Sequence, residues 1–423
     1  MCKQSQNDKP SDSRADQRPA LDKSIGDLFR DYAEQYIKIY KPDIQKIKLI
    51  RAIRLCKTPA MGAQAISCLE CGHNKVIYLS CGHTQCPLCQ YHKRKKWQTS
   101  LSNKMLKVPY VHTVFTIPHE LNGLCKANPK VMYNIIMRAS YKCIKDLSAK
   151  EENLGALPGM VSVLHTFGSD MKYHLHTHCL ITFGGVDKDG KWKWPKRAKK
   201  IAGYRAICRT FREVFLKMLR REIKKGTLNT KVNIEELITS IENKRWNVRN
   251  GYPTMNLKIL ENYLARYINR IAISKGRFEY LAKQKQVNII YKQYRKQKEN
   301  QAAPLGIKTI NPLVAIDQFL QHILPPYFQK SRYYGLHASS TFKKYAKRID
   351  QKLIKNKDSI PTLFSILMRL LKVAQYSCEK CQSLDFEIKE IVKDKNWIFN
   401  FITLPNFRAP PQSNHYIKLL TTC

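Results

Sequence analysis

Three histidines alternate along one short segment of the chain. His174, His176 and His178 occupy every second position and lead into an apolar, β-prone run at residues 179–183. On a β-strand this spacing places the three imidazoles on one face, because successive side chains point to opposite sides. Imidazoles fixed on a rigid strand bind divalent metal ions and leave coordination positions open for a substrate. The segment therefore predicts a metal site, and a polar strand edge that merely carries histidines is the alternative.

Two tyrosines could supply a matching nucleophile. Tyr263 and Tyr267 are four residues apart in a segment with helical spacing, residues 257–274, so both phenols project from one helical face. A phenol that attacks a metal-activated phosphodiester forms a phosphotyrosine and releases a 3′-hydroxyl. The bond energy is conserved, so the strand can be resealed without ATP, and the sequence has no phosphate-binding loop of the GxxxxGK[ST] type. A tyrosine pair in a helix more often serves packing, and the neighbouring metal platform favours chemistry here.

The cysteines near the N-terminus predict structural zinc. They form the pattern C-x2-C-x14-C-x2-C, in which each close pair offers two thiolates to one tetrahedral Zn²⁺. Four protein ligands leave no open position, so we expect the ion to stabilise a small module. The expected ligands are Cys68, Cys71, Cys86 and Cys89. Spare donors in the same stretch are Cys81, His73 and His83.

A further C-x2-C pair lies near the C-terminus. It consists of Cys378 and Cys381 and has no second pair nearby in the sequence. A complete zinc site there needs additional ligands, and His337 and Cys423 are the candidates.

The charge balance indicates a polyanionic partner. There are 75 Lys and Arg against 32 Asp and Glu, which gives a formal net charge of +43 in 423 residues. Such an excess points to nucleic acid first. No apolar run approaches the roughly 18 residues that span a bilayer, and residues 1–19 lack the apolar core of a signal peptide. We therefore expect a cytoplasmic protein with no membrane partner and with reduced cysteines.

Two basic stretches are candidates for DNA contact. One follows the cysteine cluster directly and contains Lys93, Arg94, Lys95 and Lys96. The other, within residues 266–298, interleaves basic side chains with aromatic ones, as in grooves that bind a single strand and stack its bases. Its candidates are Arg266, Arg270 and Arg277.

The hydrophobic periodicity predicts an α+β protein. Helical spacing occurs at residues 25–39, 43–56, 128–147 and 203–225. β-prone segments occur at residues 108–118, 160–167 and 173–183. The last two are joined by a short turn and predict an antiparallel hairpin, with His165 on its first strand and the histidine triplet on its second.

These elements suggest four regions. Residues 1–22 are a disordered lead, residues 23–105 a helical, zinc-binding DNA-recognition module, residues 106–300 the catalytic domain with the tyrosine helix, and residues 301–423 a helical, basic region with the C-terminal C-x2-C.

Taken together, the motifs resemble the two-tyrosine HUH transposases of bacterial insertion sequences, which move by a rolling-circle, single-strand mechanism. The resemblance covers residues 28–337 and rests on five segments in the same order. The segments are 86–90, 111–121, 164–168, 174–178 with 184–185, and 263–267 with 270–274.

The resemblance implies an antiparallel, palm-like HUH sheet that carries the active site, with flanking helices. It implies that His176 and His178 are the metal pair, with Mg²⁺ or Mn²⁺, and that Tyr263 and Tyr267 are the nucleophiles. It also implies an N-terminal zinc module that helps to recognise element ends, and single-stranded DNA at transposon ends and target DNA as partners.

Two positions depart from the family pattern, and one ligand is open. Thr177 stands where a bulkier apolar residue is usual, and Phe167 where Trp is common. The candidates for the third metal ligand are His174, His112, His165, His119 and Glu120.

Two other functions fit the same residues. One is a rolling-circle replication initiator or relaxase-like nickase, for which the tyrosine spacing is equally suitable. The other is a zinc-dependent nucleic-acid-binding protein with an inert site. The leading zinc module favours transposition, and the sequence leaves the oligomeric state open.

Overall fold

A five-stranded antiparallel sheet forms the centre of the protein. The computed structural model describes residues 24–230, 233–256, 275–293, 296, 301–345, 353–354, 378, 380–383 and 386–392. In order across the sheet, the strands are β12 (Ser331–Gly335), β4 (Gly159–Phe167), β5 (Tyr173–Thr182), β3 (Tyr110–Thr116) and β8 (Val248–Asn250). β4 and β5 form the predicted hairpin.

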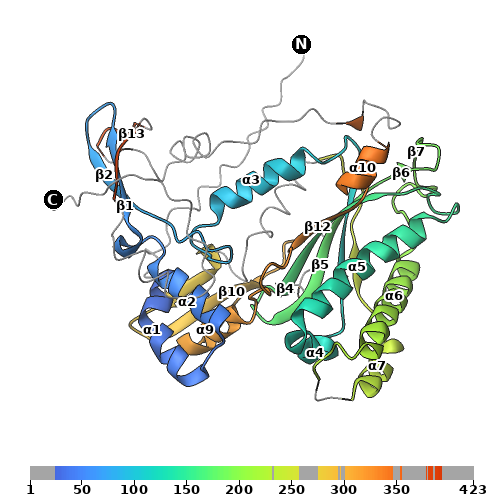
Figure 1. Ribbon diagram of the computed structural model, residues 1–423, viewed down its shortest axis with the longest axis horizontal. Helices are drawn as coiled ribbons and strands as arrows, with labels where there is room; N and C mark the ends of the chain where they lie inside the picture. The colour runs from blue at the N-terminus through green and yellow to red at the C-terminus, as the bar shows by residue number, and fades with distance from the viewer. Residues whose placement is uncertain are drawn as a thin grey trace, which may run out of the picture.

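Two long helices cover one face of this sheet. They are α5 (Pro129–Ser148) and α6 (Tyr204–Lys224), and the shorter α4 (Asn122–Ala127) and α7 (Ile234–Glu242) lie beside them (Figure 1). Every third or fourth residue of α5 and α6 is apolar, so each helix buries a continuous stripe. The stripes meet alternate residues of β3, β4 and β5 in the largest core of the described residues.

The opposite face of the sheet carries both apolar and polar side chains. Val161, Val163 and Leu180 lie on it and pack with Leu101, at the end of α3 (Tyr91–Ser102). Side chains alternate along a strand, so residues two or four positions from these three lie on the same face. His165 of β4 and His176 and His178 of β5 are such residues. The helix-covered face is thus the structural one, and the other is available for chemistry.

A second core joins segments from distant parts of the sequence. It combines α1 (Ile25–Tyr40), α2 (Ile44–Leu55) and α9 (Pro312–Leu320) with the antiparallel sheet of β9 (Phe278–Leu281), β10 (Gln286–Lys292) and β11 (Leu305–Ile310). The Phe29 and Phe319 rings meet edge to face at 5.6 Å, and the Tyr36 hydroxyl donates to Asp317 over 2.9 Å. Figure 1 shows α1, α2 and α9 side by side. The N-terminal helices therefore depend on residues that follow the central sheet.

The start of α1 shows how the sequence sets its boundary. Ser24 and Asp27 form a capping box, in which each side chain bonds the other's backbone N–H. The helix ends at Lys41, whose φ of 42° is left-handed.

A third, small sheet stands at the edge of the molecule. β1 (Ala63–Cys68) and β2 (Asn74–Tyr78) form a hairpin, and β13 (Phe386–Val392) pairs antiparallel with β1. Figure 1 shows these three strands together, apart from the central sheet. The remaining described elements are the short pair β6 (Gly185–Val186) and β7 (Trp192–Lys193), α10 (Ser339–Tyr345), and single 3₁₀ turns at Pro59–Met61, His119–Leu121 and Lys275–Arg277.

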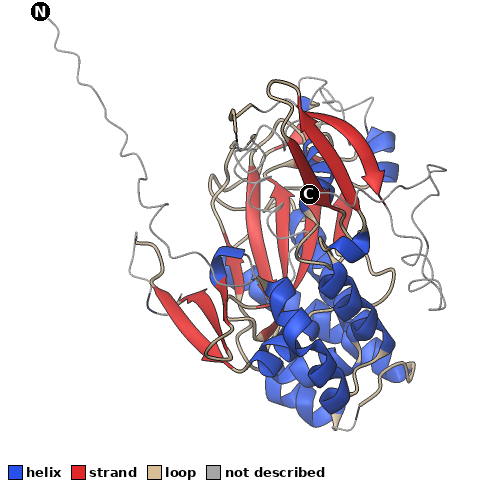
Figure 2. Cartoon of the chain, turned by 90° about the vertical axis from the view of Figure 1, so that its left-hand side faces the viewer, coloured by secondary structure: helices blue, strands red, loops and turns tan. Residues whose placement is uncertain are grey.

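The α+β class and the antiparallel sheet with flanking helices are confirmed. In Figure 2 helices and strands form separate groups instead of alternating. The described part of residues 301–423 contains α9 and α10, but also β11, β12 and β13. Residues 333–337 were expected to be helical, whereas β12 uses Tyr333 and Tyr334 to complete the central sheet, with Tyr334 stacked on Tyr141 of α5 at 4.6 Å. The segment with Tyr263 and Tyr267 lies outside the described residues.

Candidate metal centres

Three histidines of the β4–β5 hairpin converge on one point. His165 of β4 pairs in register with His176 of β5, and His178 is the next residue on the same face. The Nε2 atoms of His176 and His178 are 3.1 Å apart. The ring centroid of His165 lies 5.1 Å from that of His176 and 4.3 Å from that of His178. One ligand atom of each lies within 4.8 Å of the others. Nitrogens bound at about 2.1 Å to one ion are about 3–4 Å apart, so little movement is needed to share it.

His174 lies on the same face, as expected, with its ring centroid 4.9 Å from that of His176, but it is not one of the three grouped histidines. Phe167 pairs with Tyr173 while His165 pairs with His176, so β5 contains one extra residue in a β-bulge. The bulge shifts the pairing with β4, but the alternation on β5 continues, because Tyr173, Leu175 and Cys179 all lie in the helix-covered core. His174 is exposed, whereas His176 is 8 % and His178 7 % exposed. The structure thus places a ligand atom of His165, and not of His174, within 4.8 Å of those of His176 and His178, and the identity of the third ligand stays a prediction.

Hydrogen bonds fix how two of the imidazoles present their nitrogens. His176 Nδ1 lies 2.8 Å from the His174 carbonyl oxygen and donates to it, which leaves the Nε2 lone pair free for a ligand. His178 Nδ1 lies 3.0 Å from Nε2 of His112 on β3, and the two rings stack at 5.2 Å. His112 thus lies behind the group, where it orients His178 in the way that outer partners orient metal-bound histidines.

Burial keeps these imidazoles neutral. It lowers the pKa of His176 to about 3 and that of His112 to about 4, and it holds the pKa of His165 and His178 well below the ordinary value. The nearby Lys330 ammonium lowers the pKa of the three clustered histidines further, and burial lowers its own pKa to about 7. Neutral imidazole is the form that binds metal, so no proton must leave first.

The other candidates for the third ligand are engaged elsewhere. Glu120 forms an ion pair with Lys244 and lies 3.4 Å from His119. Among the residues that the structure describes, the group of three histidines includes no carboxylate.

Both departures from the family pattern have a packing reason. The Thr177 hydroxyl lies on the helix-covered face, 3.0 Å from the hydroxyl of Ser140 on α5. The Phe167 ring stacks on His165 at 5.3 Å with an interplanar angle of 11°. Each residue therefore supports the histidine strands from a different side.

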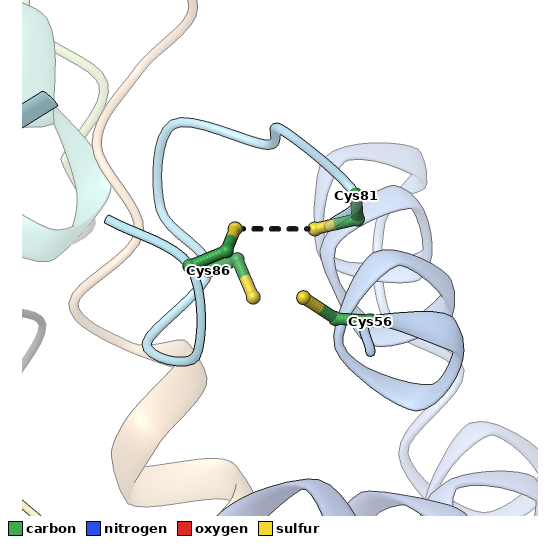
Figure 3. A group of neighbouring side chains, drawn as sticks. Cys56, Cys81 and Cys86 are labelled. Atoms are coloured by element: carbon green, nitrogen blue, oxygen red, sulfur yellow. Dashed lines mark hydrogen bonds between the residues drawn. The ribbon is translucent and has the colours of Figure 1, made fainter. Parts of the chain in front are cut away.

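The cysteines form two groups instead of the single predicted one. The first contains Cys56, Cys81, Cys86 and Cys89, with their sulfurs within 4.8 Å of one another. Figure 3 shows Cys56, Cys81 and Cys86 pointing toward one another. Cys56 follows α2 directly, and this group lies within the core that α1, α2 and α9 share. Four thiolates at this spacing suit a closed, structural Zn²⁺ site.

Cys68 and Cys71 are in the other group. Their partners are Cys378 and Cys381, more than 300 positions later in the chain. The prediction that Cys68 and Cys71 share an ion with Cys86 and Cys89 is wrong, because the β1–β2 hairpin directs them toward β13. His337, a candidate for the C-terminal pair, is instead buried beside Tyr110, 3.1 Å from its hydroxyl.

Two protein-family models match the chain. One, described as "Putative transposase", matches residues 159–344, and the other, "Transposase zinc-binding domain", matches residues 28–117. Over these two ranges the chain is similar to the transposases that both models describe.

Two curated relatives agree with these matches. A protein of Sinorhizobium fredii (strain NBRC 101917 / NGR234) named "Putative transposase y4qJ" is 28 % identical over 321 residues, 74 % of this chain and 79 % of the relative. The "Transposase for insertion sequence element IS801" of Pseudomonas savastanoi pv. phaseolicola is 24 % identical over 344 residues, 79 % of this chain and 82 % of the relative. No solved structure matches the chain.

The three candidate sites differ in whether a matched range includes them. Residues 159–344 include the histidine group, and residues 28–117 include the Cys56 group. The zinc-binding domain and the clustered thiolates support bound Zn²⁺. Cys378 and Cys381 lie outside both ranges. Within the described residues, no helix of the transposase is both long and apolar enough to cross a bilayer.

The predicted DNA-contacting residues have different surroundings. Lys93, Arg94, Lys95 and Lys96 lie in the first turns of α3, directly after the Cys56 group. Lys93 donates to the Gly82 carbonyl over 2.5 Å, so it joins the start of α3 to the loop that follows Cys81. Arg277 donates to the carbonyls of Ile290, over 2.6 Å, and of Ser169, so it joins β10 to the β4–β5 turn. Arg266 and Arg270 lie outside the described residues.

Two functional positions of the transposase were not expected from the sequence. Cys56 was missed because it stands alone, 12 residues before Cys68, and its only signal was its place at the end of a helix. Lys330 was missed because nothing in its neighbourhood marks a site. The other members of the groups had been considered as ligands or spare donors.

Proposed function

We propose that this transposase cleaves and rejoins single-stranded DNA through 5′-phosphotyrosine intermediates. The observation that supports the proposal most is the cluster of three buried, neutral imidazoles on the face of the central sheet opposite α5 and α6. A zinc-stabilised binding protein with an inert site would have no need of such an arrangement.

His165, His176 and His178 would hold a divalent ion. Bound there, the ion polarises a phosphodiester oxygen and so makes the phosphorus a better electrophile. Nitrogen donors without a carboxylate favour a transition metal over Mg²⁺, so we infer Mn²⁺ as the more effective of the two expected ions.

The chain's own residues prepare this centre. The carbonyl of His174 and the ring of His112 hold His176 and His178 in the tautomers that expose Nε2. The Lys330 ammonium adds positive charge beside the group, where it favours a bound phosphate.

Tyr263 and Tyr267 are the proposed nucleophiles. The phenolate oxygen of one attacks phosphorus, the bond from phosphorus to the 3′-oxygen breaks, and the departing oxygen takes a proton to become a 3′-hydroxyl. The reverse attack by a 3′-hydroxyl restores the strand and frees the tyrosine. Two tyrosines four residues apart in the sequence allow a second cleavage before the first link is resolved.

A denaturing gel tests the proposal. Full-length protein is incubated with labelled single-stranded oligonucleotides from the DNA that flanks its gene, with Mn²⁺, with Mg²⁺ or with neither. We expect a covalent adduct with Mn²⁺, which the double change Tyr263→Phe and Tyr267→Phe abolishes and either single change preserves in part.

Two results would overturn the proposal. One is an adduct that persists in the double variant, and the other is its absence on every flanking sequence. Nicking of only one specific strand without transfer to a second oligonucleotide would favour the replication initiator.

A further inference from the structure

Cys68, Cys71, Cys378 and Cys381 lie together at the edge of the molecule, and neither matched family range includes all four. We propose that they bind one Zn²⁺ of their own and that this ion clasps the C-terminal strand β13 onto the N-terminal β1–β2 hairpin. The inference is independent of the DNA chemistry proposed above.

The sulfur positions fit a tetrathiolate site. Cys68 Sγ lies 3.5 Å from Cys381 Sγ, and Cys71 Sγ lies 3.4 Å from Cys378 Sγ. A disulfide would bring the sulfurs to about 2.05 Å, and all four cysteines are free. Four sulfurs at about 2.3 Å from a tetrahedral Zn²⁺ are about 3.8 Å apart. The four side chains are therefore close to the geometry that zinc requires.

The two C-x2-C turns have the same backbone hydrogen bonds. Cys68 N donates to the His73 carbonyl over 2.9 Å, and Gly72 N donates back to the Cys68 carbonyl over 2.9 Å. In the other turn, Cys378 N donates to the Ser383 carbonyl over 2.8 Å, and Gln382 N donates back to the Cys378 carbonyl over 2.9 Å.

The matching positions also share an unusual conformation. Gly72 has a φ of 67°, and Gln382, at the equivalent position, adopts a left-handed φ of 59° without being glycine. The backbone N–H of His73 faces the Cys71 sulfur, as that of Ser383 faces the Cys381 sulfur. Such N–H groups stabilise thiolates. The two turns are far apart in the sequence but have the same backbone conformation, which indicates that they bind the same metal ion.

Among the side chains that the structure describes, the sheet that carries this site has only a small core. Its hydrophobic cluster consists of Ile66, Cys68 and Cys378, with Ile77 partly buried against them. Small sheets of this size normally need a disulfide or a metal. The free energy of Zn²⁺ binding to a four-thiolate site would supply the missing stabilisation.

The clasp connects distant parts of the chain. Cys71 and Cys378 are 307 positions apart, and β1 pairs with β13 from Ala63 opposite Val392 to Cys68 opposite Phe386. Zinc at this point makes the C-terminal strand a component of the N-terminal zinc module.

Zinc analysis of double variants tests the clasp. Elemental analysis gives zinc per chain for the full-length wild type and for Cys68→Ser with Cys71→Ser, Cys378→Ser with Cys381→Ser, and all four changes together. We expect each of the three variants to lose one zinc, because the two pairs share a single ion. Adding Cys86→Ser and Cys89→Ser to the C-terminal pair should remove two. As a matched control, Cys125→Ala with Cys208→Ala removes two thiols from the main core and should remove none.

The clasp is disproved if the C-terminal double variant keeps its full zinc content, or if the quadruple variant loses two ions. Iron in place of zinc would also contradict it.

Alkylation of the wild type gives a test that needs no variant. Cys71 and Cys381 are exposed to solvent, so as free thiols they would react at once with iodoacetamide. We expect them to be protected until a strong chelator is added, and then all four to react. Modification of both before chelation would refute bound metal.

Discussion

The central sheet and the small β13-β1-β2 sheet hold their metal ligands in opposite ways. In the central sheet, strands pair on both sides of β5, two helices cover one face, and the histidines are already oriented by their neighbours. In the small sheet, the hydrophobic cluster of the described side chains is Ile66 with two of the cysteines, Cys68 and Cys378. On the proposals above, the protein would organise the first site for its ion, whereas in the second region the ion would organise the protein.

This difference follows from what each ion has to do. A catalytic ion must exchange substrates, so its ligands are held by interactions that do not depend on it. A structural ion is enclosed by four thiolates and contributes directly to folding. Removal of metal should therefore affect chemistry in one region and structure in the other.

The largest expected effect is the loss of chemistry at the central sheet. His165→Ala removes one of three ligands, so we expect covalent adduct formation to fall about 1,000-fold, which corresponds to about 4 kcal/mol of lost stabilisation. The thermal midpoint should change little, because the strands and helices remain. His174→Ala is the matched control from the same strand and should retain most activity. Equal losses in both variants would contradict the assignment of His165.

Removal of metal by a chelator should affect the structure of the two sheets differently. With zinc stripped, we expect amide hydrogen exchange in β13 to accelerate at least about 100-fold, because the small sheet loses its main stabilising element. Exchange in β4 and β5 should remain slow, because their hydrogen bonds do not involve the ion. Similar acceleration in all three strands would show that the central site is also metal-dependent for folding.

A smaller effect is expected behind the histidine group. His112→Ala leaves the three ligands in place but removes the ring that orients His178, and such outer partners typically contribute about 10–100-fold in metal affinity or activity. The loss should appear as a higher Mn²⁺ concentration for half-maximal adduct formation and should be reduced at saturating Mn²⁺. A loss unaffected by Mn²⁺ concentration would show that His112 acts in another way.

The smallest effect concerns the contact between the sheet and its covering helix. Thr177→Val removes the hydrogen bond to Ser140, which keeps its bond to the Ile136 carbonyl, so we expect a loss of about 1 kcal/mol in the free energy of unfolding. Denaturant titration measures it, and the double variant with Ser140→Ala should show non-additive losses. An additive result would mean that the two hydroxyls do not interact.

Local patterns predicted much of this fold from the sequence. The hairpin of β4 and β5, with His165 opposite the histidine triplet, followed from period-two alternation and a short turn, and α5 and α6 followed from their apolar stripes. The partner of a strand is a non-local property, so the pairing of β1 with β13 had no local signal. The same holds for Cys56, which joins its group only through the packing of α2.

The position of His174 illustrates a different limit. Strict alternation placed it on the face of His176 and His178, where it lies, but alternation alone does not say which residue of the neighbouring strand stands opposite each of them. That pairing, which brings His165 opposite His176, depends on the bulge between His165 and Phe167, and no residue type in the segment marks it. Short edge strands such as β12 are equally hard to recognise, since Tyr333 and Tyr334 suit helix and strand alike.

The core that α1 and α2 share with α9 has a consequence for synthesis of the chain. Leu28, Phe29 and Tyr36 leave the ribosome early, but Phe319 and its neighbours are made nearly 300 residues later. At about 5–20 residues per second, the apolar faces of the first two helices stay uncovered for roughly 15–60 s. During that interval, the thiols of Cys56, Cys81, Cys86 and Cys89 are already available, so capture of zinc would give the nascent N-terminus its first fixed structure.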